Sequence, residues 1–78
     1  SEHLAFIEMK QYFQNLSENI LDAYNAADRV TVDVTMSELP LDVDTAVPVG
    51  LIVNELLSNA LKYAFPTGQV GRVRLALE

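Results

Sequence analysis

Residues 49–65, VGLIVNELLSNALKYAF, constrain the fold most, because they read as an apolar helix with a single polar stripe. At about 100° per residue and with Glu55 as zero, Asn59 lies at about 40° and Lys62 at about −20°. The flanking positions, at about −60° and −100°, are also polar: Ser58 and Asn54. We expect the opposite, apolar arc to be buried: Val49, Val53, Leu56, Leu57, Ala60, Leu61 and Ala64. A carboxylate, an amide and an ammonium group therefore share one face, which can hold a hydrated metal ion and the phosphates that it neutralises.

The remaining sequence predicts one more helix and two strands. Residues 1–28 carry an apolar residue at every third or fourth position, which is typical of one helical face: Phe6, Met9, Phe13, Leu16, Ile20, Ala23 and Ala27. Residues 29–36 alternate as a half-buried strand does, with three valines inward: Val30, Val32 and Val34. Residues 71–78 alternate in the same way, with Val73, Leu75 and Leu77 inward and Arg72 and Arg74 outward.

The second helix is predicted over residues 44–65. Asp44 or Thr45 is the expected N-cap, which places Pro48 in the first turn, where a missing N–H costs little. The segment after Phe65 contains proline and glycine and ends the helix. We expect Asp42 and Asp44 to serve the loop and the cap rather than a metal ion.

The element order is helix, strand, helix, strand, which predicts an α/β fold of two layers (an α+β sandwich) with helices against a sheet. All 78 residues form one partial domain in this interpretation, because the chain opens inside a helical pattern and stops inside a strand pattern. Two strands alone leave both sheet edges open. We therefore expect further strands in the native domain, and self-association as a homodimer or larger species for the isolated chain.

Composition narrows the functional classes. A formal net charge of −6 disfavours nucleic acid and anionic membranes as partners, because no basic patch is present to release counterions. No apolar run approaches the ~20 residues of a membrane span, and nothing resembles a signal peptide. The chain has no cysteine, which fits the reducing cytoplasm. The only histidine, His3, is expected at the surface near the terminus.

The run DTAVPVGLIVNELLSNALKYAFP, followed by GQVGRVRLAL, resembles the N box of two-component sensor histidine kinases. These enzymes belong to the ATPase superfamily that also includes gyrase, the heat-shock chaperone and the mismatch-repair proteins. The order N-E-L-x-x-N-A-x-K, then an aromatic residue and A-F-P, is most similar to a subclass in which a histidine usually follows the lysine. Here that position is Tyr63. The upstream run SEHLAFIEMKQYFQNL resembles, less specifically, the segment after the dimerisation and phosphoacceptor helices in that subclass.

This resemblance implies ATP and Mg²⁺ as cofactors and assigns roles residue by residue. Asn59 matches the amide that ligates the nucleotide-bound Mg²⁺, and Glu55 matches the residue that orients or deprotonates the attacking group. Lys62 matches the basic residue near the phosphates, and Tyr63 the neighbouring aromatic position. The parent enzyme would pass the γ-phosphoryl group to a histidine and then to a response regulator. The D-x-G-x-G adenine loop, the later glycine-rich loop and the lid are absent from this sequence, so the implied fragment is inactive by itself.

Three alternatives stay open at this point. The stripe also fits an ordinary solvated helix face, with Glu55 pairing Asn59 or Lys62 along the helix. The chain also fits a non-catalytic module that self-associates through its strand edges. A third interpretation is a related ATPase outside the signalling kinases.

Overall fold

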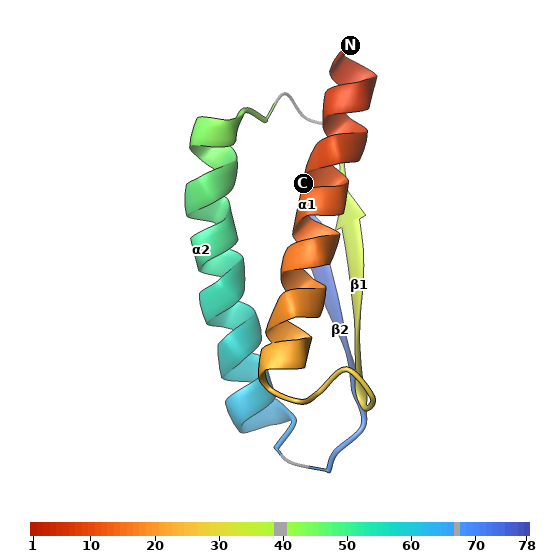
Figure 1. Ribbon diagram of the computed structural model, residues 1–78, viewed down its shortest axis with the longest axis vertical. Helices are drawn as coiled ribbons and strands as arrows, with labels where there is room; N and C mark the ends of the chain where they lie inside the picture. The colour runs from red at the N-terminus through yellow and green to blue at the C-terminus, as the bar shows by residue number, and fades with distance from the viewer. Residues whose placement is uncertain (39–40, 67) are drawn as a thin grey trace.

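The computed structural model describes residues 1–38, 41–66 and 68–78. Helix α1 spans Glu2–Ala23, strand β1 Val30–Met36, helix α2 Val43–Asn59, a π-helical turn η1 Ala60–Ala64, and strand β2 Gly71–Leu77. Both helices lie on one side of a two-stranded sheet (Figure 1). The predicted two-layer α/β arrangement is therefore confirmed in outline.

The strands are parallel, from Val30 opposite Gly71 to Met36 opposite Leu77. Parallel strands need a long crossover, which α2 and η1 provide. The inward valines and leucines are buried or half-buried, whereas Arg72 and Arg74 are exposed, as predicted. On the exposed face Arg72 Nη1 donates to Asp33 Oδ2 at 2.7 Å.

Helix α1 ends at Ala23, earlier than the predicted bound of residue 28. Asn25 has φ 53°, its N–H donates to Asp22 O (3.1 Å), and Ala26 N–H donates to Leu21 O (2.8 Å). This is a Schellman motif with asparagine in the left-handed position. This reversal of the chain leaves Ala23 and Ala27 exposed and buries Ala26. The prediction that Ala23 and Ala27 belong to the buried face is therefore wrong.

The N-cap of helix α2 lies two or three residues earlier than predicted. Asp42, not Asp44 or Thr45, is the N-cap, and its Oδ1 accepts from Thr45 N at 2.9 Å. Pro48 consequently lies inside the helix rather than in its first turn, where its missing N–H removes a helical hydrogen bond.

The core lies between the C-terminal halves of both helices and the start of the sheet. Its buried cluster is Ile20, Leu21, Ala26, Val30, Leu57 and Leu61. On the predicted apolar arc of α2, Val53, Leu57 and Leu61 are buried. Leu56 is 62% exposed and Ala64 is exposed, so their predicted burial is wrong. The reason is geometric: a two-stranded sheet and one neighbouring helix are too narrow to cover the whole arc.

Two glycines allow close approach inside this arrangement. A Cβ on Gly71 would overlap the Phe65 ring, so the aromatic ring packs directly on the glycine backbone. A Cβ on Gly50 would lie 2.7 Å from the Tyr12 hydroxyl, at the crossing of α1 and α2. Among the described residues, no helix combines the length and the apolar character needed to cross a membrane.

Candidate functional site

The predicted polar stripe lies on the outward face of α2. Asn59 Nδ2 donates to Glu55 Oε1 at 3.3 Å, and both residues are exposed. They occupy the side of the helix opposite the buried Val53 and Leu57. Because the amide nitrogen is engaged with Glu55, the Asn59 carbonyl oxygen is the amide atom left to face a ligand.

A second polar pair runs beside the first. Ser58 Oγ donates to Asn54 Oδ1 at 3.1 Å, one residue out of phase with the Glu55–Asn59 pair. This bond uses one of the two lone pairs of the Asn54 carbonyl oxygen, whereas no described side chain donates to the Asn59 carbonyl oxygen.

The helix changes its winding directly after Asn59. Residues Ala60–Ala64 form a π turn, and Phe65 N–H donates to Ala60 O at 2.9 Å, five residues back. A turn closed by i→i+5 bonds advances by less than the ~100° per residue of an α-helix. Residues after Asn59 therefore lag behind their positions in an ideal helical projection. This π turn is the last turn of the helix, whose C-cap is Phe65, and turns of this kind are common at helix C-termini.

Lys62 and Tyr63 belong to the π turn, so their positions relative to Glu55 and Asn59 differ from those in a regular α-helix. The Lys62 Nζ lies 5.9 Å from the centroid of the Tyr24 ring, at the end of α1. The ammonium group thus contacts Tyr24, the residue after α1, instead of lying on the stripe beside Glu55 and Asn59. Tyr63 is 79% exposed, so its ring is open to a ligand.

The stripe is suited to a metal ion that brings its own ligands. No cluster of three or more His, Cys, Asp or Glu side chains able to hold a metal occurs among residues 1–38, 41–66 and 68–78. Mg²⁺ is commonly held by one or two protein oxygens, with phosphates and water completing the shell. Asn59 can supply one such oxygen while Glu55 holds its amide group, and a nucleotide would supply the phosphates.

Arg29 fixes the segment that follows the π turn. Its Nη1, which carries two N–H groups, lies within hydrogen-bond distance of the carbonyls of Phe65 (3.0 Å), Pro66 (3.3 Å) and Gln69 (3.1 Å), and its own carbonyl accepts from Gly71 N at 2.9 Å. Carbonyls at the C-terminal end of a helix need such donors. Arg29 was not among the residues predicted from the sequence, because its partners are more than thirty residues away in the chain.

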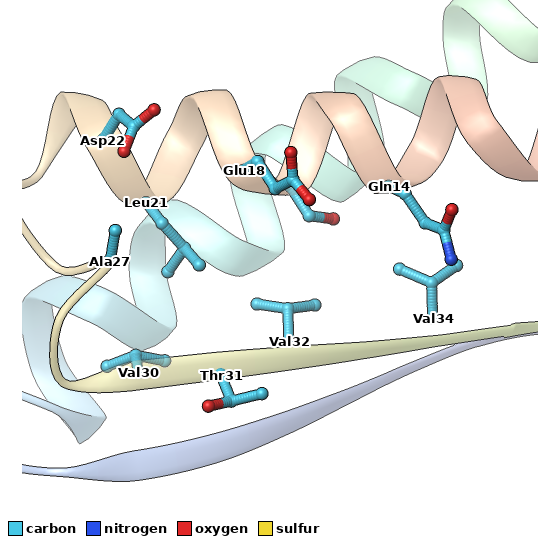
Figure 2. Close-up of a pocket in the computed structure, with 10 residues that line it drawn as sticks. Gln14, Glu18, Leu21, Asp22, Ala27, Val30, Thr31, Val32 and Val34 are labelled. Carbon is cyan, nitrogen blue, oxygen red and sulfur yellow. The ribbon is translucent and has the colours of Figure 1, made fainter.

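A separate hollow of about 560 Å³ lies between α1 and β1. In Figure 2, Val32 and Val34 point from the strand toward α1, and Glu18 and Asp22 project from the helix above. None of the described residues of α2 lines it. The hollow is therefore distinct from the polar stripe and plays no part in the candidate site.

Comparison with known proteins adds no further constraint: no family model, curated protein or solved structure matches this chain. Its function is therefore inferred from the geometry of α2 and η1 and from the N-box resemblance.

Proposed function

We propose that this chain is part of the ATP-binding domain of a sensor histidine kinase and that α2 carries its Mg-nucleotide-binding face. The observation that supports this best is the Glu55–Asn59 pair, exposed on the outward face of α2 directly before the π turn. An ordinary solvated face would also carry such a pair. The two interpretations differ in what the Asn59 carbonyl oxygen does: the proposal assigns it to a metal ion, whereas an ordinary solvated face leaves it to water.

In this proposal Asn59 Oδ1 ligates the Mg²⁺ bound to the ATP phosphates. Glu55 holds the amide through the Nδ2 bond and orients or deprotonates the attacking group. Phosphoryl transfer needs mainly positioned groups and neutralised charge, which a rigid helix can provide.

Lys62 and Tyr63 complete the proposed site. An exposed contact between an ammonium group and an aromatic ring contributes only about 0.5–1 kcal/mol. The charge-assisted hydrogen bond of Lys62 to a phosphate is stronger, at about 1.5–3 kcal/mol. Lys62 therefore leaves Tyr24 when a nucleotide binds. Tyr63 offers a ring and a hydroxyl donor to the same ligand.

The intact kinase would lie in the cytoplasm and transfer the γ-phosphoryl group to a histidine and then to a response regulator. The adenine loop and the lid motif do not occur in these 78 residues. We therefore propose that this polypeptide binds Mg-nucleotide weakly and does not catalyse phosphorylation by itself.

The second candidate function is a non-catalytic module that associates with further copies of itself. It is favoured by the two-stranded sheet, whose outer edges have no strand partner within the described residues. Sedimentation velocity over a wide concentration range tests it. A single monomeric species at every concentration contradicts this alternative.

The nucleotide proposal is tested by titrating Mg-ADP into isotope-labelled protein and following the amide signals. We expect saturable, Mg²⁺-dependent shifts at Glu55, Asn59 and Tyr63. Asn59→Ala should abolish them. Asn54→Ala is the matched control, because it breaks the equivalent hydrogen bond to Ser58 one residue away.

Equal loss of binding in both variants would mean that the helix, not the Asn59 carbonyl, was disturbed. Absence of shifts with the unmodified chain at millimolar Mg-ADP would contradict nucleotide binding by this polypeptide. Circular dichroism of each variant establishes that the fold is retained.

A further inference from the structure

A groove opens between the N-terminal halves of α1 and α2, at the end of the molecule away from the π turn. It consists of two hollows of about 570 and 390 Å³ that share Ala5, Met9, Leu41 and Asp42 as lining residues. The walls are mainly apolar: Ala5, Met9, Tyr12, Leu41, Val43 and Val47. We call this feature the acidic groove, because every charged side chain that lines it is a carboxylate.

The apolar wall is exposed on the α2 side. Val43 is 69% and Val47 52% exposed, although both belong to a regular helix next to a concave surface. Contiguous apolar surface of this kind, rimmed by polar groups, marks interaction sites. Met9 adds an adaptable side chain that can fit more than one partner surface.

The rim carries charge of one sign. Glu2, Glu8, Glu38 and Asp42 line the two hollows, and no lysine or arginine does so within the part of the chain that the structure describes. The two helix N-termini at this end contribute only about half a positive charge each, and the effect decays within the first turn. The four carboxylates therefore dominate the local potential.

This charge selects among the possible occupants. A second copy of the chain that docked symmetrically here would oppose one acidic groove with another, and an anionic membrane would be repelled in the same way. A cationic partner is attracted. A groove walled by two helices with an apolar floor suits an amphipathic helix, whose apolar side enters the groove and whose flanks meet the rim.

We infer that the acidic groove binds an amphipathic helix with basic flanks, presented by a protein partner. The apolar side of that helix covers Val43 and Val47, and its lysine or arginine side chains pair with Glu2 and Glu8. This inference does not depend on nucleotide binding, because the groove and the polar stripe have no described residue in common.

The test uses fluorescently labelled peptides designed as amphipathic helices, one of leucine and lysine and one of leucine and glutamate in the same pattern. Binding to the full chain is measured by anisotropy. We expect saturable binding of the lysine peptide and none of the glutamate peptide.

Four variants of the chain then locate the site. Glu8→Lys and Val47→Ser alter the groove. Glu18→Lys and Ile52→Ser are their controls, because Glu18 is an exposed carboxylate on the same helix and Ile52 is an apolar residue of α2, 58% exposed, outside the groove lining. The groove variants should lower the affinity for the lysine peptide by roughly fivefold or more, and the control variants should lower it by less than about twofold.

Equal weakening by Glu8→Lys and Glu18→Lys would show attraction to bulk negative charge and would overturn the inference. Equal binding of the glutamate peptide would do the same. Binding of the chain to vesicles of phosphatidylserine and phosphatidylcholine, lost in Val47→Ser, would assign the groove to a membrane surface instead.

Discussion

The two ends of this molecule are held together by different means. At the closed end, where both helices finish and both strands begin, buried side chains, the Schellman motif and the Arg29 hydrogen bonds fix the chain (Figure 1). At the open end, the helix N-termini are held by their own caps, by an exposed His3–Glu38 pair at 2.9 Å and by a partly filled groove.

This difference places the proposed nucleotide site on the more stable half of α2. Regions with many buried apolar contacts open with free energies close to that of global unfolding, and sparsely packed regions open more easily. Asn59 and the π turn belong to the first kind. The acidic groove belongs to the second, which suits a surface that adapts to a partner.

The largest expected effect is the loss of a buried leucine at the closed end. Leu61→Ala should lower the free energy of unfolding by about 3 kcal/mol, because it leaves a cavity in the core. Leu56→Ala, at an exposed position on the same helix, should cost less than about 0.5 kcal/mol. Urea unfolding followed by circular dichroism measures both, and similar losses would show that Leu56 is packed in solution.

Adding a methyl group where Phe65 packs on the backbone should have the next largest effect. Gly71→Ala should lower the free energy of unfolding by about 2 kcal/mol, because the new Cβ overlaps a large ring. Gly50→Ala, whose Cβ meets only the movable end of the Tyr12 side chain, should cost less than about 1 kcal/mol. A double variant with Phe65→Leu should recover most of the Gly71→Ala loss, and additive losses would break the packing explanation.

Removing the Arg29 guanidinium should have a smaller effect on stability but a local effect on the π turn. Arg29→Ala should cost about 1–2 kcal/mol, since its carbonyl partners regain water when exposed. Hydrogen exchange at the Phe65 amide should accelerate. Arg72→Ala removes an exposed ion pair and should cost at most about 1 kcal/mol, with Phe65 exchange unchanged. Unchanged Phe65 exchange in Arg29→Ala would mean that Arg29 does not hold the closed end together.

The smallest effect is expected at the open end. His3→Ala should change the free energy of unfolding by less than about 0.5 kcal/mol, because His3 and its hydrogen-bond partner Glu38 are both largely exposed. Thermal unfolding of the variant measures this. A loss above about 1 kcal/mol would mean that contacts at the open end contribute to the free energy of unfolding as much as those at the closed end. The proposed difference between the two ends would then be wrong.

Hydrophobic periodicity predicted the two helices, the two strands and the outward face of α2, because an element buried on one side has apolar residues at regular spacing. Leu56 shows the limit of this method, since a helical projection does not give the width of the sheet and helix that cover the apolar side. The end of α1 was predicted too late, although Asn25 is a residue type that favours the left-handed conformation.

The candidate site was predicted in part. Glu55 and Asn59 lie one helical turn apart, so their pairing follows from local geometry. The π turn could not be predicted, because it depends on how Leu61 and Phe65 pack against other elements. The position of Lys62 was predicted wrongly for the same reason. Its ammonium group was expected on the stripe, but it lies beside Tyr24. Arg29 was missed because its partners come from a distant segment.

The central claim is that the Asn59 carbonyl ligates a nucleotide-bound metal. Titration of Mn²⁺ with ADP into the isotope-labelled chain tests it most directly, because paramagnetic broadening of amide signals reports distance from the metal. We predict broadening centred on Glu55, Asn59 and Tyr63, dependent on ADP and lost in Asn59→Ala but not in Asn54→Ala. Broadening centred on the carboxylates of the acidic groove, or persisting in Asn59→Ala, would contradict this claim.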